Sequence, residues 1–157
     1  MSMYSRMRVA PTDLERYAPI VGRTVIANLT SRAFGTRSAA LLSGLTPLLH
    51  SLGLDAEWWA GRGAGEFHAV GSLLASASAG RRVRWTTALR DAWLDLAEAE
   101  QPLASGQVDF VLVHDAQPLP IAAKLEGTLA AGAVRLWICH FDQRVVVDEV
   151  WTAVAEQ

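Results

Sequence analysis

Short, continuously apolar runs rich in β-branched residues alternate along the chain with longer segments in which apolar residues recur every three or four positions. Runs of the first kind predict buried strands, and segments of the second kind predict amphipathic helices. The expected strands span residues 24–29, 54–60, 109–115 and 133–140. The expected helices span residues 39–52, 66–78, 86–101 and 118–129, with a helix, or a short strand and a helix, over 145–155. Pro47 lies within the first of these helices and predicts a kink or a break there.

This order of elements predicts the fold class. Strands that are apolar throughout are typical of parallel sheets buried on both faces. Their alternation with helices indicates a Rossmann-like α/β domain with three layers and a mainly parallel sheet. A chain of 157 residues has room for one such domain. We expect residues 17–157 to form it and residues 1–16 to be an N-terminal tail with a short helix.

Composition and charge exclude several classes of protein. Hydrophobic residues make up 51% of the chain and charged residues 19%, which is too apolar for a disordered protein. The net charge of −2 gives no basic excess, so neither nucleic acid nor an anionic membrane is an expected partner. No apolar run is long enough to cross a membrane, and the first residues lack the apolar core of a signal peptide. The single cysteine, Cys139, favours a cytoplasmic location.

Polar residues gather where the predicted strands end. Open parallel sheets bind ligands at the carboxyl ends of their strands. Two strands here end in a histidine closely followed by an aspartate, which gives the candidate catalytic residues His114, Asp115, His140 and Asp142. These side chains can orient hydroxyl groups or act as acid and base, although histidines bonded only to backbone atoms are the alternative. Their spacing fixes no metal site and no cofactor fingerprint occurs, so we expect neither a metal nor a cofactor.

The loop after the first strand is a second candidate for ligand binding. It leads into a helix, whose free N–H groups can hold an anion or a sugar hydroxyl. Gly35 would let the backbone approach a ligand, Arg37 could pair with phosphate, and Ser38 could cap the helix. An ordinary strand-to-helix turn with a capping serine is equally consistent. The candidate substrate-binding residues on this and the two following loops are Gly35, Thr36, Arg37, Ser38, Arg62 and Gln117.

Four segments, taken together and in order, resemble one protein family. They are residues 17–22 (YAPIVG), 48–59 (LLHSLGLDAEWW), 111–118 (VLVHDAQP) and 137–142 (WICHFD). The family is the trehalose synthase of the glycosyltransferring type, a retaining GT-B glycosyltransferase of group 4. The resemblance implies the N-terminal half of a GT-B fold, which chiefly receives the acceptor sugar. It further implies that His140 lies near the transferred sugar, that His114 and Asp115 line the cleft, and that the first loop lies near donor phosphate and acceptor.

The sequence departs from the family pattern in three places. The first loop has one glycine, Gly35, where the family has a run of them. Arg23 leads straight into the first strand, where the family has a helix. We further expect the protein to lack the donor-binding domain of the family. We therefore expect a domain that binds a sugar or a similar hydroxylated small molecule and needs a donor-binding partner subunit for transfer. The face left without that domain also favours a homo-oligomer.

Two alternatives to this function are open at the level of sequence. The chain could be a non-catalytic accessory or dimerisation protein that keeps the same pocket. It could also be a repurposed small biosynthetic enzyme that uses the two His–Asp pairs on a different substrate.

Overall fold

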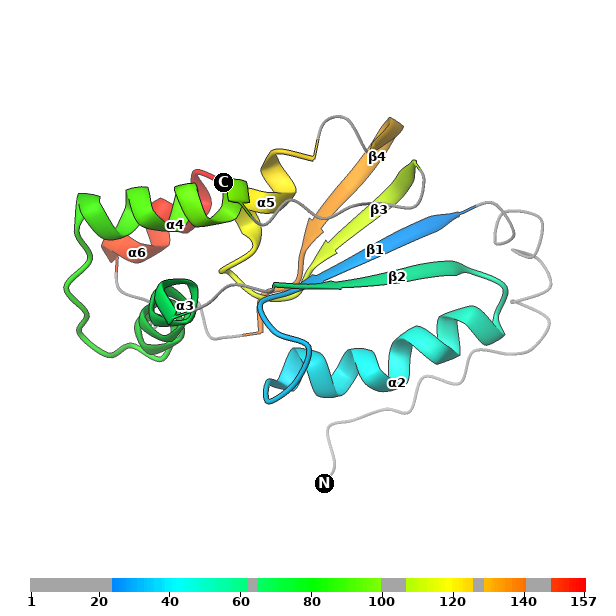
Figure 1. The fold of residues 1–157 in the computed structure, drawn as a ribbon, viewed down its shortest axis with the longest axis horizontal. Coiled ribbons are helices and arrows are strands. Elements are labelled where there is room, and N and C mark those ends of the chain that lie inside the picture. Colours follow the sequence, from blue (N-terminus) through cyan, green and yellow to red (C-terminus); the bar gives the residue numbers. More distant parts are fainter. Residues whose placement is uncertain (1–23, 62–64, 100–106, 126–128, 141–147) are drawn as a thin grey trace, which may run out of the picture.

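The structure is a computed structural model that describes residues 24–61, 65–99, 107–125, 129–140 and 148–157. These ranges contain four strands and five helices, whose arrangement Figure 1 shows. In chain order they are β1 (Val25–Thr30), α2 (Arg37–Ser51), β2 (Asp55–Ala60), α3 (Gly65–Ser78), α4 (Thr87–Ala99), β3 (Val108–Val113), α5 (Leu119–Ala123), β4 (Leu129–Trp137) and α6 (Asp148–Ala155).

The four strands form one parallel sheet in the order β2-β1-β3-β4. The register places Asn28 of β1 between Trp58 of β2 and Leu112 of β3, and Leu112 beside Leu136 of β4. All strands therefore end at the same edge, where the loops that follow them meet. The predicted Rossmann-like α/β class, with its parallel sheet, is confirmed.

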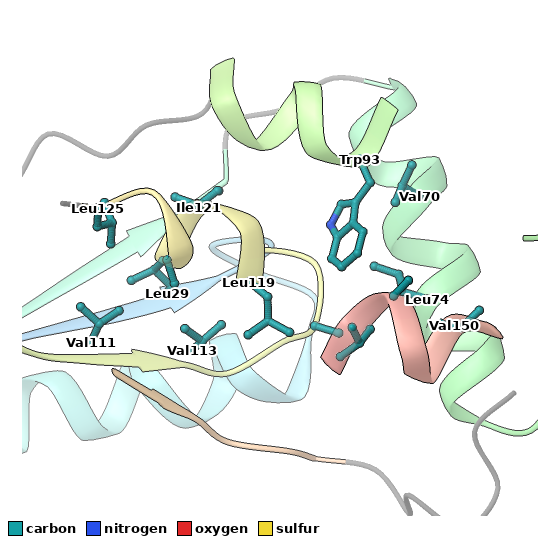
Figure 2. Close-up of a cluster of buried hydrophobic side chains, with 14 of the residues drawn as sticks. Leu29, Val70, Leu74, Trp93, Val111, Val113, Leu119, Ile121, Leu125 and Val150 are labelled. Atoms are coloured by element: carbon teal, nitrogen blue, oxygen red, sulfur yellow. The ribbon is translucent and has the colours of Figure 1, made fainter. Parts of the chain in front are cut away.

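The main hydrophobic core lies on one face of the sheet. Ala27 and Leu29 of β1 and Val111 and Val113 of β3 point to this face and pack with residues of α3, α4, α5 and α6 (Figure 2). Trp93 of α4 is fully buried there, and its indole N–H donates to the carbonyl of Gln117 over 2.7 Å. A buried indole needs such a partner, so this bond fixes α4 over the loop that follows β3.

Helix α2 lies along the opposite face, beside β1 and β2 (Figure 1). Ala39 and Leu42 bury its inner side. Thr36 caps its N-terminus, because its hydroxyl accepts a 3.0 Å hydrogen bond from the N–H of Ala39. The helix continues through Pro47, so the break considered at this residue is absent. Pro47 is exposed, and water can satisfy the carbonyl that the missing N–H leaves without a donor.

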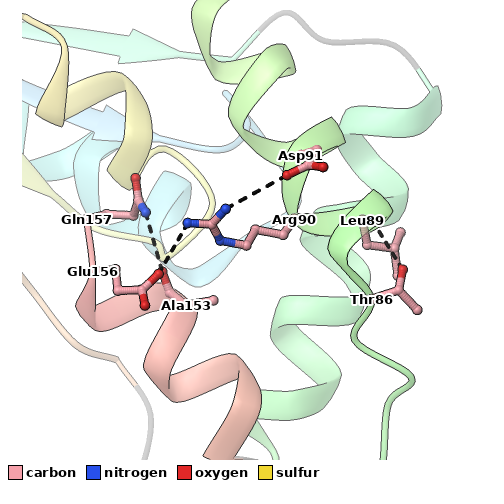
Figure 3. Close-up of polar contacts among 7 residues, drawn as sticks. All are labelled: Thr86, Leu89, Arg90, Asp91, Ala153, Glu156 and Gln157. Atoms are coloured by element: carbon pink, nitrogen blue, oxygen red, sulfur yellow. Dashed lines mark hydrogen bonds and ion pairs between the residues drawn. The ribbon is translucent and has the colours of Figure 1, made fainter.

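A surface ion pair connects α4 with Glu156, which directly follows the C-terminal helix α6. The guanidinium of Arg90 lies 3.3 Å from the carboxylate of Glu156 and 3.8 Å from that of Asp91 (Figure 3). All three side chains are at least 40% exposed, so these pairs add little to stability. The buried residues Val150, Ala153 and Val154 hold α6 in place instead.

The predicted helix over residues 118–129 is wrong in its second half. Helix α5 ends at Ala123, and Leu129 already pairs with Val108 as the first residue of β4. Strand pairing with β3 outweighs the helical preference of the Leu-Ala-Ala sequence at 129–131. Strand β4 consequently begins and ends earlier than the predicted span 133–140.

The sequence predicts a sheet that is buried on both faces, but β4 is exposed on one of them. Phe110, Val134, Leu136 and Ile138 share the face that α2 covers over β1 and β2, but they are 36–48% exposed. Within the described ranges no helix covers them. We call these four residues the open apolar face. None of the helices in the described part of the chain has the length and apolarity needed to span a membrane.

Candidate functional site

A cavity of about 580 Å³ opens at the carboxyl edge of the sheet. Its walls are the loop between β1 and α2, the segment after β3, the end of β4 and one side of α3. The structure brings six of the predicted site residues into this lining, namely Thr36, Arg37, His114, Asp115, Gln117 and His140. Gly35 belongs to the loop between β1 and α2 and Ser38 to the first turn of α2, and neither lines the cavity. Arg62 and Asp142 lie outside the described residues.

Asp115 holds the loop between β1 and α2 in place by accepting hydrogen bonds at both ends of the loop. One carboxylate oxygen accepts hydrogen bonds from the backbone N–H of Ser31 at 2.9 Å and from its hydroxyl at 3.0 Å. The other oxygen accepts a 2.8 Å hydrogen bond from the hydroxyl of Ser38. Ser38 is therefore not the helix cap, which is Thr36, but a link from the first turn of α2 to Asp115. The carboxylate positions this wall of the cavity.

His114 is almost fully buried at the base of the cavity, with 1% of its surface exposed. Its Nε2 lies 3.1 Å from the side-chain oxygen of Asn28. Its Nδ1 is buried and has no hydrogen-bond partner among the described residues. Burial lowers the pKa of His114, and the neighbouring His140 lowers it further, while Asp115 acts in the opposite direction. The imidazole is therefore neutral at pH 7.

His140 lies beside His114 at the end of β4. The two rings are stacked, with centroids 5.8 Å apart and planes 14° from parallel. In contrast to His114, the His140 side chain is exposed, and it makes no hydrogen bond within the described part of the chain. The two strand-terminal histidines thus lie side by side, one buried and bonded to Asn28 and the other exposed.

The loop between β1 and α2 and the first residue of α2 bring two positive charges to the cavity. Arg32 and Arg37 line the cavity, and neither has a carboxylate partner in the ranges that the structure covers. Gly35 has a φ of +77°, a conformation that glycine adopts easily and other residues rarely adopt. The single glycine of this loop is therefore needed for the turn itself.

Gln117 joins the cavity to α3. Its side-chain amide donates to the carbonyl of Phe67, and its side chain fills the space beside Gly71. A Cβ at Gly71 would lie 2.7 Å from the Gln117 Cδ atom, so only glycine permits this approach. Gln117 is 4% exposed, so its main role is to connect α3 with the segment that follows β3.

Sequence reasoning missed three residues of this site. Asn28, Ser31 and Arg32 were not among the candidates, although all three touch or support the cavity. Asn28 had a visible signal, because a polar residue in the middle of a buried apolar strand needs a specific partner. No group of three or more His, Cys, Asp or Glu side chains that could hold a metal ion occurs within the described ranges.

The chain is similar to known trehalose synthases. The profile of the family "Trehalose synthase, N-terminal domain" matches residues 28–157. Trehalose synthase of Thermococcus litoralis is 30% identical over 117 residues, which cover 73% of this chain and 27% of that protein. Trehalose synthase of Pyrococcus horikoshii is 30% identical over 139 residues, which cover 87% of this chain and 32% of that protein. The chain thus spans about a third or less of the relatives it matches, and it belongs to the family of trehalose synthase N-terminal domains.

Proposed function

We propose that this chain binds a sugar, or a similar hydroxylated small molecule, in the cavity at the carboxyl edge of its sheet. The observation that carries the proposal is the convergence of hydrogen-bonding groups from three loops on one cavity. His114, His140 and Thr36 offer hydrogen-bonding partners for hydroxyl groups, and Arg32 and Arg37 add donors. The match to the N-terminal domains of trehalose synthases supports a sugar over other hydroxylated ligands.

We infer that the domain acts as the acceptor side of a trehalose-synthase-like glycosyltransferase. The matched relatives are named for the synthesis of trehalose and are about three to four times as long as the region they share with this chain. Transfer would need a nucleotide-sugar site that faces the cavity, and we propose that a donor-binding partner subunit supplies it. A cytoplasmic location, suggested by the single cysteine, is part of the same proposal.

Self-association is a further part of the proposed function. Strand β4 is an edge strand nine residues long, with Arg135 as its only charged residue. Edge strands of this kind readily pair with another chain. The open apolar face beside this edge would extend across a two-fold axis between two copies.

A thermal-shift screen tests the sugar-binding proposal. A ligand that binds only the native state raises the melting temperature. We expect a rise with D-glucose or trehalose, a smaller response to nucleotide-diphosphate sugars, and loss of the rise in His140→Ala. Arg84→Ala is the matched control, because Arg84 is exposed and does not line the cavity. Equal shifts in both variants would place the binding site elsewhere, and no shift with either sugar would contradict the proposal.

A further inference from the structure

Asn28 is a fully buried polar residue in the central part of β1. Its side-chain nitrogen donates to the carbonyl of Glu57 in the neighbouring strand β2, over 3.3 Å. Because the nitrogen is engaged on that side, the amide oxygen faces β3, where it lies 3.1 Å from Nε2 of His114. The orientation of the Asn28 amide is thus set by the sheet itself.

This orientation determines which nitrogen of His114 carries the proton. An amide oxygen can only accept a hydrogen bond, so Nε2 must be the N–H of the neutral ring. The other nitrogen, Nδ1, then keeps its lone pair and is an acceptor. It is buried at the cavity and has no partner among the described residues. Buried acceptors without a partner are uncommon in folded proteins, which points to a donor supplied from outside the domain.

We propose that Asn28 is a positioning residue that holds His114 as the Nε2–H tautomer, so that Nδ1 accepts a hydrogen bond from a hydroxyl group of a bound sugar or polyol. This inference rests on the proposed function, since the cavity must bind such a ligand. It deepens that function by assigning one hydroxyl of the ligand as a donor. A ligand that offers only an acceptor at this point, such as a phosphate oxygen, leaves Nδ1 without a partner.

Nδ1 of His114 is buried, so a ligand hydroxyl can reach it only if a neighbouring group shifts. His140 stacks on His114, and its side chain is exposed. We expect the His140 ring to turn aside from His114 when the ligand binds and to contact the ligand itself. His114 cannot move in the same way, because Asn28 and the surrounding core fix its ring.

The tautomer can be measured in the wild-type protein without any ligand. Long-range ¹H–¹⁵N spectra of histidine-labelled protein at pH 7.5 distinguish a protonated from an unprotonated ring nitrogen, and His114→Gln assigns the signals. We expect His114 to be protonated at Nε2, and Asn28→Leu to give a mixture of tautomers. A wild-type His114 protonated at Nδ1 overturns the inference, whether or not the protein binds sugar.

Binding of D-glucose and trehalose by calorimetry tests the role of Nδ1. We expect Asn28→Leu to weaken binding by about three- to tenfold, the effect of one neutral hydrogen bond. Asn28→Asp keeps an acceptor toward Nε2 and should preserve the Nε2–H tautomer above the pKa of the imidazole, with binding recovered as pH rises. If Asn28→Leu loses the Nε2–H tautomer of His114 but binds the sugar with the same affinity as the wild type, the inference is overturned. No binding by a wild type that has the expected tautomer overturns the proposed function and the assigned ligand hydroxyl, but not the role of Asn28.

Discussion

Asp115 lines the cavity and accepts three hydrogen bonds, two from Ser31 in the loop after β1 and one from Ser38 in the first turn of α2. Residues of this kind are easily taken for catalytic groups from sequence alone, because a carboxylate at the end of a strand looks the same in both roles. These hydrogen bonds show that Asp115 has a structural role. A loss of ligand binding in an Asp115 variant would therefore not by itself identify a contact to the ligand.

The first prediction concerns the stability that Asp115 provides. Asp115→Ala leaves the Ser31 N–H and the hydroxyls of Ser31 and Ser38 without their acceptor, and it should lower the free energy of unfolding by about 2–4 kcal/mol. Urea denaturation measures the change. Asp91→Ala, an exposed carboxylate on α4, is the control and should change stability by under about 0.5 kcal/mol. Equal effects in the two variants would contradict the role given to Asp115.

The second prediction concerns pH. The pKa of His114 is lower in the folded chain than its usual value of 6.5, so the unfolded state takes up a proton first as the pH falls. The stability contributed by the neutral ring is complete above about pH 6.5 and decreases as pH falls toward the lowered pKa. His114→Gln should flatten this part of the curve of unfolding free energy against pH. An unchanged slope would show that His114 does not titrate in the predicted direction.

At the scale of elements, the sequence predicted three strands and three helices within one or two residues. Continuous apolar runs placed β1, β2 and β3, helical periodicity placed α2, α3 and α4, and parallel pairing then brought His114 and His140 to one edge. The boundary between α5 and β4 could not be read in the same way, because the Leu-Ala-Ala sequence at 129–131 suits either structure until β3 lies beside it. Thr36 and Ser38 are both good helix caps, and only the position of Asp115 decides between them.

The close approach of α3 to Gln117 yields the third prediction. Gly71→Ala places a methyl group against the Gln117 side chain, which is held by Phe67 and cannot move away freely. We expect thermal unfolding to show a loss of about 1–3 kcal/mol. Gly44→Ala in α2 is the control, since a Cβ there meets nothing within 4 Å and should add about 0.5–1 kcal/mol. Stabilisation by both substitutions would mean that the Gly71–Gln117 contact does not constrain the fold.

The fourth prediction concerns the open apolar face and the edge strand β4. Sedimentation velocity of the wild type should show a dimer, and Leu136→Glu should shift it to the monomer by placing a charge in the proposed interface. Ala88→Glu is the control, because Ala88 is exposed on α4, which lies on the opposite face of the sheet. A wild type that is monomeric at high micromolar concentration would contradict self-association through this face.

At the scale of the whole molecule, the described part of the chain is a sheet with one covered face, one partly covered face, and a cavity at its carboxyl edge. We propose a sugar as the ligand of this cavity and a partner subunit as the source of the donor site. Ligand binding can therefore be tested on this domain alone, separately from transfer.

Histidine side-chain NMR during a titration with D-glucose or trehalose tests the central claim most directly. His114 and His140 line the cavity, whereas His50 and His68 do not, so one spectrum contains both probes and controls. We predict that the NMR signals of His114 and His140 shift and saturate together, while the signals of His50 and His68 do not change. Saturable shifts confined to His50 or His68, or no shift at any histidine up to sugar concentrations of tens of millimolar, would contradict the assignment of this cavity as a sugar site.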